Sequence, residues 1–246
     1  MPRTTLVPPE RPDLVTRLAA LDWRALEASL WAHGHAETAP LLTPDECAQL
    51  AASYDDESRF RSRVEMARHR FGEGEYKYFS RPLPRLVEAL RSGFYPPLAV
   101  IANRWQDALA ASNRYPLVHQ DLLEQCHAAG QDRPTPLILR YRAGGYNCLH
   151  QDLYGDVAFP FQVMLPLSRH GVDFTGGEFL LVEQRPRAQS AGEVLCPAQG
   201  AAVIFTTRVR PARGRSGFHR VQVRHGVSRV RSGTRMALGI IFHDAR

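Results

Sequence analysis

The sequence has little lysine, few cysteines and no long hydrophobic run. Lys77 is the only lysine among the 246 residues, so arginine supplies nearly all of the positive charge behind a net charge of +6. The four cysteines are scattered without a Cys-x-x-Cys pair, which excludes a zinc ribbon and a paired-thiol redox site. No run is long enough to span a membrane, and residues 1–21 carry charges instead of the apolar core of a signal peptide. We therefore expect a cytoplasmic protein with no membrane contact and no obligate protein partner.

Helical patterns occupy the first half of the chain. Between residues 22 and 33, apolar side chains recur on one face, and Gly34 can end the helix. Thr43 and Glu46 have the spacing of a capping box around Pro44, which predicts a helix to about residue 53. Further helices are predicted at 83–92, 96–112 and 116–128.

Short β-rich runs replace the helical patterns after residue 133. Turns rich in Gly, Pro and Asp separate these runs, as in an antiparallel sandwich or barrel. Earlier in the chain, residues 71–79 alternate aromatic and charged side chains, which predicts a strand that covers the core or lines a substrate groove. The sequence thus predicts a helical N-terminal region, 1–133, packed on a β-domain, 134–246. The β-rich runs are 137–141, 159–167, 178–183, 201–206, 218–224 and 236–242.

The segment from Tyr141 to Asp152 ends in a His-x-Asp pair, His150 and Asp152. At the end of a strand, this spacing directs both side chains to one side, because side chains alternate with a period of two. A distant second histidine would complete the two-His, one-carboxylate face that non-haem Fe(II) oxygenases use. Such a pair also arises by chance, as a surface His and Asp in a turn.

His219 and His225 are the two serious candidates for the missing ligand. A keto-acid cosubstrate would need a cation for its far carboxylate, and arginine suits that role through its bidentate fork. Arg235 follows His225 by ten residues and is predicted to open a strand after a hairpin turn at residues 232–233. We favour His225 with Arg235, and His219 with Arg229 is the alternative.

These residues together resemble the Fe(II)- and 2-oxoglutarate-dependent dioxygenases. The spacing of Tyr141 and Arg235 from the histidines is similar to the prolyl-4-hydroxylase and alkylation-repair branches. The segments 71–79, 147–155 and 239–245 look like a bacterial oxygenase family whose name proposes oxidation of damaged or methylated nucleic acid. The resemblance covers most of the chain beyond about residue 40. It implies an α+β fold with a double-stranded β-helix, or jelly-roll, core.

The resemblance also implies the chemistry of the site. Fe(II) would bind His150, Asp152 and His225, while Arg235, helped by Tyr141, would bind 2-oxoglutarate. Dioxygen and 2-oxoglutarate would be consumed with formation of succinate, and ascorbate would help as a reductant. Halogenating relatives have a small residue in place of Asp152, so hydroxylation or oxidative demethylation is expected instead.

The substrate is predicted less sharply than the cosubstrate. No acidic residue occurs between Val194 and His243, and the arginines there, several in a loop at 208–215, would attract nucleic acid or another anionic substrate. A protein side chain or a small metabolite is the alternative substrate, and a basic jelly roll that only binds is the non-enzymatic alternative. Asn147 and Tyr154 flank the predicted metal site without an assigned role.

Overall fold

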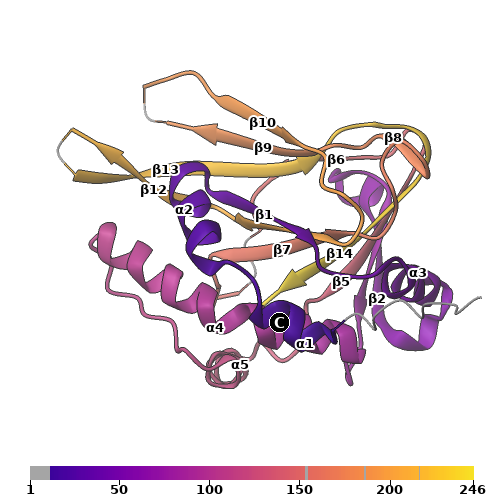
Figure 1. Cartoon of the computed structure of the whole chain (residues 1–246), viewed down its shortest axis with the longest axis horizontal. Helices are drawn as coiled ribbons and strands as arrows, with labels where there is room; N and C mark the ends of the chain where they lie inside the picture. Colours follow the sequence, from indigo (N-terminus) through magenta and orange to yellow (C-terminus); the bar gives the residue numbers. More distant parts are fainter. Residues whose placement is uncertain (1–11, 153–154, 186, 216) are drawn as a thin grey trace, which may run out of the picture.

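A computed structural model describes residues 12–152, 155–185, 187–215 and 217–246. Two antiparallel sheets face each other, and helices cover the outer face of the larger sheet (Figure 1). This arrangement is an α+β fold with a jelly-roll core, which confirms the predicted fold class. In this part of the chain no helix is long and apolar enough to cross a membrane. Tyr154 lies outside the described residues.

The helices of the described residues all precede residue 130. They are α1 (Leu14–Ala19), α2 (Trp23–His33), α3 (Pro44–Ala52), α4 (Arg85–Ala108) and α5 (His119–Ala128), with short 3-10 turns at Ser53–Asp55, Glu57–Arg59 and Met66–His69.

Each sheet combines strands from distant parts of the chain. The larger sheet has the order β1-β11-β7-β14-β5-β4-β2, with β8 beside β14: β1 (His35–Pro40), β2 (Phe60–Glu65), β4 (Glu75–Phe79), β5 (Leu137–Arg142), β7 (Phe161–Pro166), β8 (Phe174–Gly176), β11 (Ala201–Thr206) and β14 (Val230–Ile241). The smaller sheet has the order β10-β9-β13-β6-β3, with β12 beside β13: β3 (Gly72–Glu73), β6 (Tyr146–His150), β9 (Phe179–Gln184), β10 (Ala191–Leu195), β12 (Val209–Gly214) and β13 (Gly217–Val227).

Local signals explain the first helices, but the N-terminal half is not only helical. Asp22 caps α2 and Gly34 ends it in the left-handed conformation, while Thr43 and Glu46 form the predicted capping box at α3. Three strands of this half, β1, β2 and β4, extend the larger sheet, and β3 joins the smaller one. All the described helices therefore precede the predicted boundary at residue 133, but each sheet takes strands from both sides of it.

Tertiary packing overrides the predicted break within α4. Two helices were predicted between residues 83 and 112, but the single helix α4 runs through Pro96 and Pro97. Gly93 lies within this helix, and a side chain there would collide with Leu18 on α1. A proline inside a helix costs about 3 kcal/mol or more, and the burial of one whole face of α4 against the larger sheet offsets that cost.

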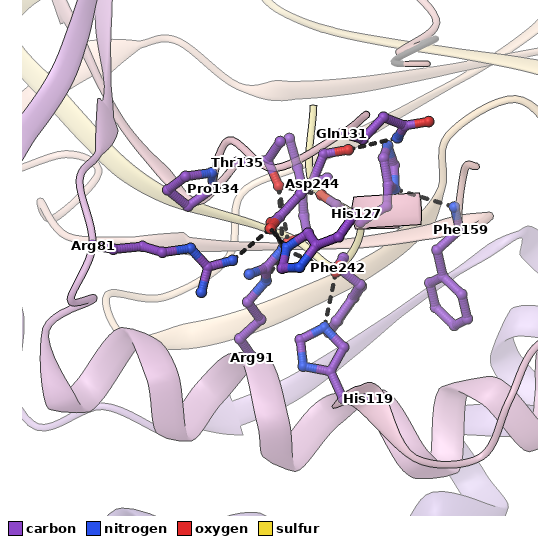
Figure 2. A network of polar contacts seen from close by, with 12 residues as sticks. Arg81, Arg91, His119, His127, Gln131, Pro134, Thr135, Phe159, Phe242 and Asp244 are labelled. Carbon is purple, nitrogen blue, oxygen red and sulfur yellow. Dashed lines mark hydrogen bonds and ion pairs between the residues drawn. The ribbon is translucent and has the colours of Figure 1, made fainter. Parts of the chain in front are cut away.

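A buried ion pair joins α4 to the residues that follow β14 (Figure 2). Arg91 and Asp244 are both almost fully buried, and Arg91 Nη2 donates to Asp244 Oδ1 at 2.7 Å and to the Phe242 carbonyl oxygen at 2.9 Å. Arg81 and His127 reach the other carboxylate oxygen of Asp244. Burial opposes the charge of Asp244, but Arg91 holds the pKa of this carboxyl below its usual value. The network thus anchors the strand that carries Arg235.

We predict that Asp244→Asn destabilises the protein, because the Arg91 cation stays buried without its partner. Breaking a buried pair in this way costs on the order of 3–5 kcal/mol, which corresponds to a fall in melting temperature of roughly 6–20 °C. Asp156→Asn is the matched control, because Asp156 is exposed, and its melting temperature should stay within about 2 °C of the wild type.

The pH dependence of this effect has a defined sign. A carboxyl with a lowered folded pKa stabilises the protein above its ordinary pKa, and the stabilisation is lost as pH falls through the folded pKa. The difference between wild type and Asp244→Asn should therefore persist at neutral pH and shrink only in strong acid. Equal melting temperatures of Asp244→Asn and Asp156→Asn at neutral pH would contradict the role of the ion pair.

Candidate metal centre

The register of the two sheets brings the distant site residues together. On the smaller sheet, His225 of β13 pairs with His150 of β6. On the larger sheet, Arg235 of β14 pairs with Tyr141 of β5. These four side chains and Asp152 line one cavity of about 470 Å³ between the sheets.

The turn between β13 and β14 does not lie where it was predicted. Residues 232–233 were expected to form it, but β14 already begins at Val230, and the chain turns at residues 228–229. Gly233 has a φ of 75°, and a side chain there would collide with the backbone of Asp173 next to β8. The glycine therefore marks a close approach of two strands, and the favoured arginine lies inside β14 instead of at its start.

His150, Asp152 and His225 converge on one point. One ligand atom of each residue lies within 4.8 Å of the others. Asp152 Oδ1 is 3.4 Å from His150 Nε2, and Asp152 Oδ2 is 3.3 Å from His225 Nε2. His150 Nδ1 lies 2.8 Å from the carbonyl oxygen of Cys148. That contact places the ring proton on Nδ1 and leaves the Nε2 lone pair facing the cluster.

The protonation of the cluster suits a divalent metal ion. Burial lowers the pKa of His225, so its ring is neutral and can coordinate. Burial opposes the charge of Asp152, but contacts with both imidazoles hold its pKa well below the usual value. Burial also opposes the charge of His150, yet Asp152 raises the pKa of that ring. A bound metal ion would displace the proton that Asp152 favours on the His150 ring. The ion would then sit on a face made of two imidazoles and one carboxylate.

The other histidines that follow residue 133 lie elsewhere. His219, the alternative ligand, is exposed on the β12–β13 hairpin. His170 lies 3.7 Å from Glu178 on the protein surface. His243 Nδ1 accepts a hydrogen bond from the backbone nitrogen of Phe159. The geometry therefore brings His225, and not these histidines, to the His-x-Asp pair.

Arg235 is a buried cation that forms no salt bridge with an acidic side chain of the described residues. It is 4% exposed, and its guanidinium carbon lies 5.5 Å from the centroid of the Tyr141 ring. Gly177 makes room for it, because a side chain there would contact Arg235 Cδ. Burial lowers the pKa of Arg235, and a buried charge without a partner costs several kcal/mol. A ligand carboxylate beside the guanidinium would offset this cost.

Tyr141 adds a hydrogen-bond donor next to this cation. Its hydroxyl is buried and makes no hydrogen bond of normal geometry with the described residues. Burial raises the pKa of Tyr141 to about 12, although Arg235 and Asn147 act in the opposite direction, so the hydroxyl keeps its proton at neutral pH. Gly74 permits the packing, because a side chain there would collide with the Tyr141 ring. The site thus fits a dicarboxylate that reaches from Arg235 towards the metal ligands.

Gln162 was not predicted from the sequence to belong to the cavity. Gln162 on β7 donates from Nε2 to Asp152 Oδ2 at 2.9 Å. Its only signal was that it is the one polar residue in the apolar run 161–166. At the rim of the cavity, Phe71 is 47% exposed and stacks on His69 with ring centroids 5.3 Å apart.

The predicted strand at residues 71–79 has two roles. It forms β3 and β4, which Gly74 separates. Phe79 packs in the core between the helices and the larger sheet, whereas Tyr76 lines the cavity, as does Asn147. The segment therefore covers the core at one residue and lines the cavity at another, while its contact with substrate stays a prediction.

The chain matches a known protein family. A family model described as an oxygenase catalysing oxidative methylation of damaged DNA matches residues 74–245. Two proteins of Mycobacterium tuberculosis, from strains CDC 1551 / Oshkosh and H37Rv, are each 51% identical over 167 residues. The match covers 68% of this chain and 72% of each relative, and both relatives are named as uncharacterized proteins.

Solved structures share the fold. A prolyl-4-hydroxylase from Pseudomonas putida has a TM-score of 0.54 and 16% identity, covering 91% of this chain and 99% of its own. An oxidoreductase of the 2OG-Fe(II) oxygenase family from Burkholderia pseudomallei has a TM-score of 0.53 and 16% identity, covering 92% and 94%. The α-ketoglutarate-dependent epimerase SnoN of nogalamycin biosynthesis has a TM-score of 0.55 and 13% identity, covering 88% and 80%. With the family match, the suspected resemblance is confirmed: the chain belongs to the Oxygenase-NA family and is an oxygenase with the jelly-roll fold of the 2-oxoglutarate- and Fe(II)-dependent enzymes.

Proposed function

We propose that this oxygenase binds Fe(II) through His150, Asp152 and His225 and 2-oxoglutarate through Arg235 and Tyr141. One observation carries the proposal: a two-His, one-carboxylate cluster and a buried arginine that forms no salt bridge with the described acidic residues share one cavity. When bound, Fe(II) and 2-oxoglutarate would activate dioxygen, with 2-oxoglutarate converted to succinate and CO2 and one oxygen atom delivered to the substrate. Ascorbate would keep the iron ferrous between turnovers.

The residues of the chain prepare this chemistry by binding and orienting. The neutral ring of His225 and Nε2 of His150 offer lone pairs, and the ionised carboxylate of Asp152 adds a negative charge to the same face. Arg235 and Tyr141 would hold the far carboxylate of 2-oxoglutarate, so that its keto end points to the metal ligands. The apolar walls from β9 and β11 keep bulk water from the cosubstrate.

Removal of any one ligand should abolish tight metal binding. We predict that His150→Ala, Asp152→Ala and His225→Ala each weaken Mn(II) binding by more than about 100-fold, beyond the range typical of residues that only support a ligand. His219→Ala is the matched control and should bind Mn(II) as the wild type does, because His219 is exposed on the hairpin. Titration calorimetry measures all four variants. Tight binding by His225→Ala, or its loss in His219→Ala, would mean that the second histidine is misassigned.

Arg235→Met should weaken 2-oxoglutarate binding and leave the ligand-free protein at least as stable as the wild type. Loss of a charge-assisted hydrogen bond of 1.5–3 kcal/mol corresponds to roughly a 10- to 150-fold higher Kd. The ligand-free variant no longer buries a charge that lacks a salt bridge to the described acidic residues, so its melting temperature should be equal or higher. Arg229→Met removes an exposed arginine and is the control. Unchanged 2-oxoglutarate affinity in the Mn(II)-loaded Arg235→Met protein would reject the role of Arg235.

Basic residues on the β12–β13 hairpin support an anionic substrate. The hairpin β12–β13 extends beyond the other strands of the smaller sheet (Figure 1). Near its base, Gln151, the residue before Asp152, donates to the carbonyl oxygens of Arg208 and Val223. The predicted loop at 208–215 is thus largely strand β12, and within it Arg210 is buried against Glu183. The exposed arginines of this hairpin are Arg208, Arg213, Arg215, Arg220 and Arg224.

An aromatic platform at the cavity rim supports nucleic acid as the substrate. Phe71 and His69 stack with an interplanar angle of 21°, and Arg70 between them in sequence also lines the cavity. Exposed rings next to cations are the usual way in which proteins stack nucleobases. The description of the matched family, which concerns damaged DNA, agrees with this substrate. We infer that a modified or damaged base is hydroxylated or oxidatively demethylated in the cavity.

Phe71→Ala should therefore weaken binding of a single-stranded oligonucleotide. Stacking contributes about 1–3 kcal/mol per base, so the Kd should rise roughly 5- to 150-fold, while Mn(II) binding stays unchanged. Leu117→Ala is the control, because Leu117 is 55% exposed and does not line the cavity. Fluorescence anisotropy at several salt concentrations measures both, since binding to phosphates falls with salt. No binding of oligonucleotide by the wild type would reject nucleic acid and favour a protein side chain or a small metabolite.

A further inference from the structure

Gln162 contacts the carboxylate of the metal-site cluster from a strand that carries none of the three ligands. It lies on β7 in the larger sheet, is 6% exposed, and donates from Nε2 to Asp152 Oδ2 at 2.9 Å. An ionised carboxylate only accepts hydrogen bonds, so the amide nitrogen must face it. The contact therefore links the larger sheet to the residues that follow β6.

The apolar core does not require a glutamine at this position. Gln162 pairs across the sheet with Phe205 on β11 and Ile241 on β14, and both neighbours are buried and apolar. Burying an amide costs free energy that its hydrogen bonds must offset. A hydrophobic residue of the same size would pack between these neighbours without that cost. The contact with Asp152 is therefore what explains the glutamine.

A neutral donor suits a carboxylate that must also bind a cation. An arginine or lysine beside Asp152 would neutralise its charge and compete with a metal ion for it. An amide instead fixes the orientation of the carboxylate and leaves its negative charge available. Hydrogen bonds of this kind to a ligating carboxylate commonly tune metal affinity.

We propose that Gln162 is a positioning residue that holds Asp152 in the orientation of a metal ligand. The proposal rests on the metal site proposed above, and it assigns to β7 a part in that site. Its consequence is that the free carboxylate is already oriented before a metal ion arrives.

The test replaces the amide without changing the volume of the side chain. Gln162→Met should raise the Kd for Mn(II) by about 10- to 100-fold, the range observed when such supporting contacts are lost. The absorption spectrum of the Co(II)-loaded variant should also differ from that of the wild type, because the carboxylate is free to turn and the ligand geometry changes. Gln199→Met is the matched control, because Gln199 donates to the Leu167 carbonyl oxygen and does not line the cavity.

The outcomes separate this inference from the metal site itself. Absence of Mn(II) binding by the wild type would overturn the metal site. Wild-type affinity and an unchanged Co(II) spectrum in Gln162→Met would overturn the role of Gln162 while the metal site stands. A merely structural glutamine would lower the melting temperature without altering the spectrum, which also counts against the proposal. If circular dichroism shows that Gln162→Met is unfolded, Gln162→Asn replaces it, because its shorter amide cannot reach Asp152 and the same losses are expected.

Discussion

The pairing register of β13 with β6 and of β14 with β5 is the constraint on which the site depends. It places His225 opposite His150 and Arg235 opposite Tyr141, although the partners are far apart in the sequence. A slip of one residue in either pair would turn these side chains to the opposite face of the sheet. The helices that pack on the larger sheet stabilise this register. So does the buried ion pair between Arg91 of α4 and Asp244, which follows β14.

The interior of the barrel is electrostatically incomplete in the free protein. Arg235 is buried without a salt bridge to the described acids, the Tyr141 hydroxyl is buried next to it, and three ligand groups crowd around one point. None of these groups helps a core to fold, because each carries a desolvation cost that apolar residues would avoid. A cation bound to His150, Asp152 and His225 would supply a partner for the metal-site cluster. A dicarboxylate would supply one for Arg235. The buried amide of Gln162 also carries a desolvation cost, which its hydrogen bond to Asp152 offsets.

Much of this site was predictable, because it rests on spacing along strands. The period of two predicted that His150 and Asp152 share a face, and the need for a cation behind the metal selected His225 with Arg235 over His219. The prediction of a turn at residues 232–233 was wrong, because a glycine needed for close strand contact looks the same in sequence as a turn glycine. The long α4 was missed for a similar reason, since its proline pair is tolerated only through tertiary packing. Gln162 was missed because its partner lies on another sheet.

The central prediction is that a metal ion and a keto acid complete this cavity together. X-ray diffraction from crystals grown without oxygen, with Mn(II) and 2-oxoglutarate, tests it most directly, because the anomalous signal of manganese locates the ion. We predict one ion bonded to His150, Asp152 and His225 at roughly 2.0–2.3 Å, with the far carboxylate of 2-oxoglutarate on Arg235. An ion held elsewhere, or a keto acid bound away from Arg235, would contradict it.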